Sequence, residues 1–265
     1  MRSTARPFRE VSPRTGSLLI PCIDVSHGRT TEPSAVPGLG DPGSVADLAR
    51  HYCRGGARKV FLDVVDPWAD TGYLVPLLRE VRRTGIDQLL VSVGHGVLPS
   101  VEHAERLLDA GADVVSVSTS FLEEPETVRA ATRALGGHRF MGVINSRRTG
   151  EQRWRACTHD GQRETSVDVL EVARGMAELE LGALLANSLD REGTGEGFDI
   201  GLTRAVADSS GLPVIASGGC GTLAHLRPAV TEGRAAYVLL NKMLHAGRHS
   251  VAQVHDALLT SAAAR

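Results

Sequence analysis

Two stretches of the sequence decide the fold: residues 89–96, which read LLVSVGHG, and residues 214–221, which read VIASGGCG. Each is a short apolar run that ends in glycines, and each precedes a segment whose apolar residues recur every three or four positions, as in a helix. Further apolar runs of this kind begin near Leu18, Val60, Val114, Phe140, Leu184 and Val238. Eight strand–helix units in about 250 residues are typical of an α/β fold, the (βα)8 TIM barrel. We therefore predict one barrel domain over residues 17–265, preceded by an N-terminal extension over residues 1–16.

The two halves of this pattern resemble each other. In the first half, FLD at residues 61–63 is followed by the first glycine stretch and then by AGAD at residues 110–113. In the second half, SLD at residues 188–190 is followed by the second glycine stretch and then by EGRA at residues 232–235. The order is the same and the spacing nearly so, which predicts a barrel built from two similar half-barrels.

Composition excludes several classes of partner. The formal net charge of −2 provides no basic field for nucleic acid or for an anionic membrane. No stretch approaches the ~20 apolar residues that a membrane helix needs. The four cysteines are too far apart for a CxxC motif, and a chain of this size needs no disulfides, so we expect a cytoplasmic location. The ten histidines show no metal-ligand spacing, and we expect neither a metal nor a cofactor.

Polar residues at predicted strand ends are the candidates for catalysis, because barrel enzymes act at the carboxyl ends of their strands. Asp24, Asp63, Asn145 and Asp190 stand at such ends. Asp24 suits a general acid or base that faces the barrel mouth, and the alternative is a side chain that caps a loop or helix. His95 is a second candidate proton donor, with a histidine that only serves its turn as the alternative.

Glycine clusters at two strand ends indicate phosphate binding. Gly94 and Gly96 form one cluster, and Gly218 and Gly219 belong to the other. Glycines let backbone N–H groups approach a phosphate closely, and the helix that follows adds a favourable dipole. A tight turn without a ligand explains either cluster alone, but two clusters at matching places predict a substrate with a phosphate at each end.

Neighbouring residues complete the two predicted anion sites. Ser118 and Thr119 follow the next strand of the first half, as Asn241 and Lys242 do in the second. Lys242 suits a phosphate as a point charge, with a solvated surface lysine as the alternative. The polar loop at residues 190–197 is either a phosphate loop or a plain connection, and it contains Asp190, Glu192, Gly193 and Thr194.

Taken together, these residues resemble the cyclase subunit of imidazole glycerol phosphate synthase, whose close kin is the isomerase that precedes it in histidine biosynthesis. The resemblance runs from about Leu18 to His245. It is carried by residues 20–25 (IPCIDV), 40–42 (GDP), 61–63 (FLD), 110–113 (AGAD), 188–194 (SLDREGT) and 215–219 (IASGG). It implies a (βα)8 barrel that binds a bisphosphate substrate, adds ammonia delivered by a glutaminase subunit and closes an imidazole ring. Two aspartates act as acid and base in that family, and Asp24 matches the first.

The sequence departs from the family at catalytic positions. Asn145 occupies the place of the second aspartate, and an amide can hold a substrate but cannot transfer a proton near neutral pH. Glu32 stands where the family has a lysine in the early loop, so an anion replaces a cation.

Positions that the resemblance connects with the substrate have changed as well. His95 replaces the middle glycine of the first phosphate loop, Glu192 an aspartate, Lys242 a serine, and Asn187 a threonine. The glycines at residues 94, 96, 193 and 219 remain, so the sequence predicts that phosphate binding is better preserved than acid–base chemistry.

The resemblance also implies a ring of four charged residues at the lower end of the barrel, where ammonia enters from the glutaminase. The matching positions are Leu18, Arg58, Val114 and Ala183, which cannot form such a gate. Three interpretations stay open. The chain is a divergent cyclase in which His95 or Glu192 assists Asp24, a paralogue in a specialised pathway that forms or cleaves a C–N bond in another phosphorylated substrate, or a non-catalytic phosphate-binding scaffold.

Overall fold

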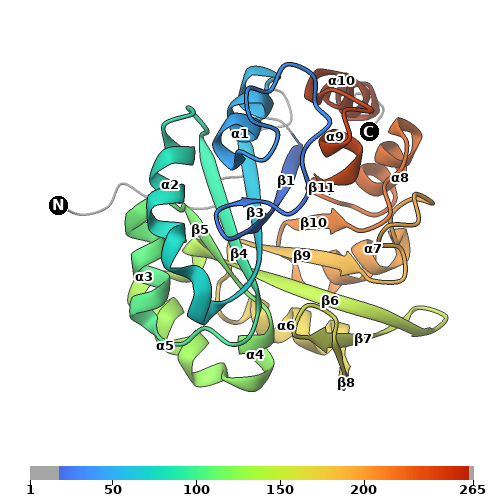
Figure 1. The fold of residues 1–265 in the computed structure, drawn as a ribbon. Coiled ribbons are helices and arrows are strands. Elements are labelled where there is room, and N and C mark those ends of the chain that lie inside the picture. The colour runs from blue at the N-terminus through green and yellow to red at the C-terminus, as the bar shows by residue number, and fades with distance from the viewer. Residues whose placement is uncertain (1–17, 263–265) are drawn as a thin grey trace.

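The computed structural model describes residues 18–262, and the predicted N-terminal extension lies outside the described residues. Eight parallel strands form a closed barrel, because the pairing order β5-β4-β3-β1-β11-β10-β9-β6 is completed by pairing of β5 with β6 (Figure 1). The strands are β1 (Leu19–Ser26), β3 (Lys59–Pro67), β4 (Gln88–His95), β5 (Val114–Val117), β6 (Phe140–Gly150), β9 (Ala183–Ser188), β10 (Val214–Ser217) and β11 (Tyr237–Leu240). The predicted barrel of two half-barrels is confirmed, and every predicted strand begins within one or two residues of its place.

Helices surround the barrel and return the chain from each strand to the next (Figure 1). Those of the first half are α1 (Val45–Arg54), α2 (Leu74–Arg82), α3 (Val101–Ala110), α4 (Thr119–Glu123) and α5 (Pro125–Leu135). Those of the second half are α6 (Val169–Ala177), α7 (Ile200–Ser210), α8 (Leu226–Thr231), α9 (Lys242–His245) and α10 (Val251–Ala262). Short 3₁₀ turns cover Trp68–Tyr73, Gly137–Arg139 and Leu223–His225. Ser44, Asp168 and Asp199 begin α1, α6 and α7 by accepting a hydrogen bond from a backbone N–H of the first turn.

The strands are apolar on both faces, because one face packs on the helices and the other fills the barrel. Along β1, Leu19 and Ile23 belong to the outer core, whereas Ile20 and Cys22 point into the lumen. The lumen is filled by apolar side chains from all eight strands, including Phe61 and Met141. The barrel is therefore a packed core and not a pore, and its polar side chains gather at the ends.

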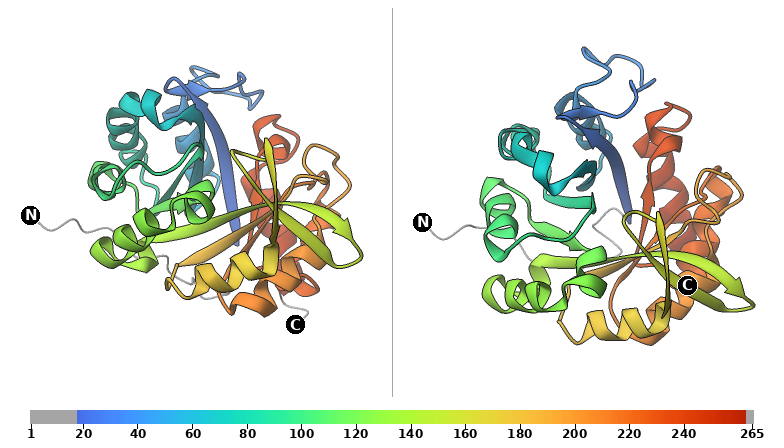
Figure 2. Two further views of the ribbon diagram at one scale, coloured as in Figure 1. Left: turned by 90° about the horizontal axis from the view of Figure 1, so that it is seen from below. Right: turned by 60° about the horizontal axis from the view of Figure 1, so that its bottom comes forward.

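Three short strands extend this barrel beyond the eight predicted strands. β2 (Arg29–Thr30) pairs antiparallel with the end of β1. β7 (Arg153–Thr158) folds back along the long strand β6, and β8 (Arg163–Asp168) pairs with β7, so the two form a hairpin that projects from the barrel (Figure 2). No helix of the described residues is long and apolar enough to cross a membrane.

Candidate active site

A cavity of about 370 Å³ lies at the carboxyl ends of the barrel strands. It brings together twelve of the residues that the sequence singles out: Asp24, Asp63, Gly94, Ser118, Asn145, Asn187, Glu192, Gly193, Gly218, Gly219, Asn241 and Lys242. Residues from both half-barrels therefore face one space. Other singled-out residues do not line it: His95, Gly96, Thr119, Asp190 and Thr194.

The side chains outside the cavity hold loops in place. Thr119 is 1% exposed, and its hydroxyl accepts a hydrogen bond of 2.8 Å from the backbone N–H of His159. Asp190 accepts a hydrogen bond of 2.7 Å from the backbone N–H of Arg148. Thr194 donates to the carbonyl of Arg191 within its own loop. His95 and Gly96 lie at the end of β4 without lining the cavity, and Glu32 of the early loop is exposed outside it.

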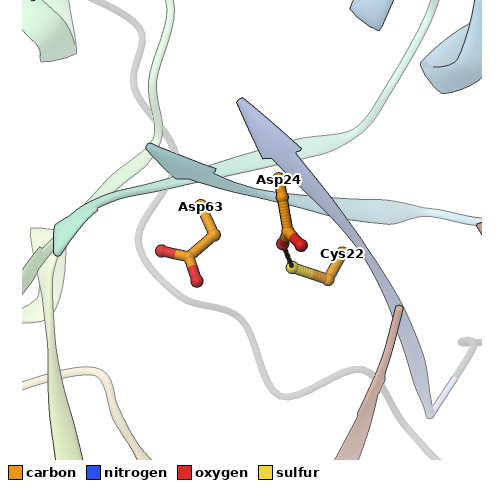
Figure 3. Close-up of side chains that lie close together, drawn as sticks. All are labelled: Cys22, Asp24 and Asp63. Carbon is orange, nitrogen blue, oxygen red and sulfur yellow. Dashed lines mark hydrogen bonds between the residues drawn. The ribbon is translucent and has the colours of Figure 1, made fainter. Parts of the chain in front are cut away.

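Asp24 is held at the mouth from two sides. The Asn241 amide donates a hydrogen bond of 2.6 Å to one carboxylate oxygen, and the Cys22 thiol donates a longer one of 3.6 Å to the other (Figure 3). Asn241 follows β11 and Asp24 lies near the carboxyl end of β1, and these two strands are paired neighbours in the barrel. These contacts fix the direction in which the carboxylate faces the cavity.

Asp63 lies beside Asp24, because β1 and β3 pair with these two residues opposite each other (Figure 3). Burial is the main reason that the pKa of Asp63 is well above its ordinary value, and the charges of Asp160 and Asp24 raise it further. Ser92 opposes the shift through a hydrogen bond. Asp63 therefore holds its proton to a higher pH than an aspartate that is exposed to solvent.

Cys22, Asp24 and Asp63 offer potential metal ligands, since their ligand atoms lie within 4.8 Å of one another (Figure 3). A thiolate and two carboxylates suit Zn²⁺. Burial, followed by the charges of the two aspartates, raises the pKa of the Cys22 thiol well above its ordinary value. The thiol is therefore protonated in this arrangement and acts as a hydrogen-bond donor to Asp24.

Opposite this trio, a chain of amides and a carboxyl group connects β6, β9 and the loop that follows β9. The Asn187 amide donates a hydrogen bond of 2.9 Å to the Asn145 side-chain oxygen, and Asn187 also hydrogen-bonds to Glu192. Glu192 is exposed as a whole residue, yet desolvation of its carboxyl group, followed by the charges of Asp160 and Asp24, raises its pKa. Asn187 and Lys242 oppose this shift.

Glycines and cations form the part of the cavity next to β10 and β11. Gly218 and Gly219 have φ of 89° and 97°, in the region that favours glycine. A β-carbon on Gly219 would lie 2.3 Å from the carbonyl oxygen of Gly197, and the Gly197 N–H donates to the Gly219 carbonyl at 2.8 Å. Lys242 extends over this surface, with its ammonium nitrogen 3.7 Å from the position that a β-carbon on Gly193 would take. The exposed Arg248 adds a second cation to the same lining.

Asp160 lines the cavity and was not among the predicted site residues. It belongs to the turn between β7 and β8, with φ of 54°, and it is followed by Gly161. Asp-Gly between two strand-like segments is a strong hairpin signal, and it was the sequence feature that could have revealed this residue. The pairing of the hairpin with β6 then brings Asp160 to the mouth.

The positions that the resemblance connects with the lower end of the barrel contain no charged ring. Val114 and Ala183 are fully buried, and Arg58 forms an ion pair of 2.6 Å with Asp87. A different cation, Lys59, lies inside the barrel at this end, with 1% exposure.

A comparison with known families gives a match over most of the chain. A family model described as "Histidine biosynthesis protein" matches residues 18–250. The matched segment contains all eight barrel strands and all the residues that line the cavity, from Cys22 to Arg248.

Proposed function

Because the chain belongs to the histidine biosynthesis protein family, we propose that it is an isomerase- or cyclase-type enzyme that makes or breaks a C–N bond in a phosphorylated ribose-type substrate. The observation that carries this proposal is a pair of carboxyl groups in unlike environments. Asp24 of β1 and Glu192 of the loop after β9 face one cavity, and desolvation together with the charges of Asp160 and Asp24 raises the pKa of Glu192. A carboxyl group with a raised pKa is suited to act as an acid, and a second carboxyl group on the same cavity is placed to act as the base.

Asp24 is the residue that we assign as the base. Its carboxylate accepts hydrogen bonds from Asn241 and Cys22, which fix its direction at the mouth. It therefore points toward the cavity as a proton acceptor for a bound substrate.

Glu192 is the residue that we assign as the acid. Desolvation and the neighbouring carboxylates favour its protonated form, and Asn187 fixes its direction. Asn145 cannot take this role, because an amide does not exchange a proton near neutral pH. Asn145 instead accepts from Asn187, so the two amides position the Glu192 carboxyl group.

The phosphate of the substrate is assigned to the glycines and cations beside β10 and β11. Main-chain N–H groups at glycines approach an oxyanion without interference from side chains, and Lys242 supplies a point charge. Within the described part of the chain Lys242 forms no ion pair, so its charge is available to a ligand.

The test is turnover of phosphorylated ribose-type substrates, both monophosphates and the family's bisphosphate, with excess ammonium salt, which removes any need for a glutaminase. Glu192→Gln should lower kcat by ~10²–10⁴-fold, the usual effect of losing general acid–base help. Glu196→Gln is the matched control, because Glu196 lies in the same loop, pairs with Arg191 and does not line the cavity.

If Glu192→Gln turned over the substrate as fast as the wild-type protein, the assignment of Glu192 as the acid would be wrong. A silent wild-type protein that becomes active as Asn145→Asp would also overturn it, because the missing aspartate would then be the cause. Silence in all variants would overturn the assigned substrate.

A further inference from the structure

The two sides of the cavity differ in charge. The barrel order places β4 and β5 across the mouth from β10 and β11. The cations that line the cavity, Lys242 and Arg248, both follow β11. On the opposite side, the described residues that line the cavity from β3, β4 and the end of β5 include no cation: they are Phe61, Asp63, Val65, Ser92, Gly94 and Ser118. Asp160, from the turn between β7 and β8, faces the same side.

The hairpin tip that carries Asp160 is fastened to the segment after β5. The backbone N–H of His159 donates to the Thr119 hydroxyl at 2.8 Å, and the His159 ring lies 3.1 Å from the Glu123 carboxylate. Arg163 also reaches Glu123, at 3.4 Å. Because His159 and Arg163 both contact Glu123, neither side chain is directed at the cavity.

This attachment brings the Asp160 carboxylate to the glycine at the end of β4. One of its oxygens lies 3.7 Å from the position that a β-carbon on Gly94 would take, and the carboxyl carbon lies 3.6 Å from it. The space beside Gly94 is the place where the duplicated pattern predicts the first of two phosphates. A negatively charged side chain of the protein stands there instead, and the Thr119 side chain that the pattern assigned to the same phosphate is buried and does not line the cavity.

We propose that the cavity takes a substrate with a single phosphate, bound beside β10 and β11, and that Asp160 excludes a second phosphate from Gly94. The side of Asp63 and Asp160 receives a hydrogen-bond donor of the substrate, a hydroxyl or an amine. This inference rests on the proposed function, whose phosphorylated ribose-type substrate it narrows to a monophosphate. Like charges placed face to face are a common means of rejecting a wrong ligand.

The test compares the binding of ribose 5-phosphate and ribose 1,5-bisphosphate by calorimetry. The wild-type protein should bind the bisphosphate no more tightly than the monophosphate. Asp160→Asn removes the charge and keeps the shape, and asparagine tolerates the positive φ of this turn. Because Asp160 is exposed and its charge is partly screened, we expect this variant to bind the bisphosphate ~10-fold more tightly, with the monophosphate unchanged.

Two further variants test whether a change in affinity comes from the charge of Asp160 or from the phosphate site beside β10 and β11. Glu164→Gln removes another hairpin carboxylate, which pairs with Arg147 and does not line the cavity, and it should change neither affinity. Lys242→Ala should weaken both ligands alike.

A wild-type protein that prefers the bisphosphate by 10-fold or more would overturn the inference and leave the proposed function intact. An unchanged preference in Asp160→Asn would overturn it as well. If neither ligand binds to the wild-type protein or to Asp160→Asn, the proposed function itself fails.

Discussion

Lys59 places an ammonium group inside the lower end of the barrel. It begins β3 and is 1% exposed, and its side chain donates to the Gln88 amide oxygen and lies 5.2 Å from the centre of the Tyr237 ring. Burial lowers its pKa from the ordinary 10.5 to about 8, although the charges of Asp87 and Asp113 oppose the shift. The folded protein therefore binds this proton less tightly than the unfolded chain does.

The lowered pKa makes stability depend on pH in a defined window. Above about pH 10.5 the amine is neutral in both states, and its contribution is at its most favourable. As the pH falls from about 10.5 to about 8 the unfolded chain gains the proton first, so stability is lost, and below about pH 8 the loss is complete. A pKa difference of this size corresponds to about 3 kcal/mol. Lys59→Met has no amine to protonate. As the pH falls through this window, its free energy of unfolding should therefore rise by about 3 kcal/mol relative to that of the wild-type protein.

Urea unfolding at several values between about pH 7 and pH 11 measures this difference. Lys59→Met also removes a donor from Gln88, which costs ~1–3 kcal/mol at every pH. The change with pH, not the absolute stability, is therefore the quantity to compare. Lys242→Met is the matched control, because Lys242 is the other lysine of the chain and is exposed. A stability difference between Lys59→Met and the wild-type protein that stays constant with pH would refute the reasoning.

Two other perturbations test how the mouth is built. Gly219→Ala should lower stability by ~1–3 kcal/mol and weaken binding of ribose 5-phosphate, because the new β-carbon would meet the Gly197 carbonyl at 2.3 Å and φ is positive. Gly72→Ala, which has open space and no positive φ, is its control, and equal thermal unfolding of the two variants would contradict the steric argument. Asp199→Ala should cost ~2–4 kcal/mol in urea unfolding, because the carboxylate caps α7 and accepts two hydrogen bonds from Arg148, at 2.8 and 2.9 Å. A loss below ~1 kcal/mol would show that solvent replaces these contacts.

The barrel could be predicted because its strands are buried on both faces and read as continuous apolar runs. The hairpin of β7 and β8 could not be found in this way. It lies outside the barrel, and exposed arginines alternate with the buried Trp154 and Ala156 along β7. β7 pairs with the part of β6 that extends beyond β5. The regular succession of apolar strands and helices that predicts the barrel therefore does not predict this pairing. The Asp-Gly turn was the remaining signal.

The candidate site was predictable to the extent that it follows strand ends. The rule that barrel sites lie at the carboxyl ends of strands selects Asp24, Asn145 and Lys242 without any tertiary information. The same rule cannot show which side chains meet across the mouth. Asn241 and Asp24 are 217 positions apart, and their contact depends on the closure of the barrel between β11 and β1. Likewise, nothing in the local sequence shows that the hydroxyl of Thr119 fastens a distant hairpin.

The duplicated halves place their first loops in equivalent ways. The loop after β1 packs against the segment after β11. The backbone N–H of Ala35 donates to the carbonyl of His245, and the His245 ring nitrogen lies 2.9 Å from the Glu32 carbonyl oxygen. The hairpin after β6 leans on the segment after β5 through His159. The first loop of each half-barrel therefore contacts the segment that follows the last strand of the other half-barrel.

The difference between the halves lies in what these loops carry. The loop after β1 keeps its acidic residues, Glu32 and Asp41, outside the cavity, whereas the hairpin after β6 directs Asp160 against Gly94. The barrel supplies two matching glycine strand ends, and one inserted loop makes them unequal in charge. Substrate selection in this fold is therefore expected to change through the loops, while the eight strands and their packed lumen stay the same.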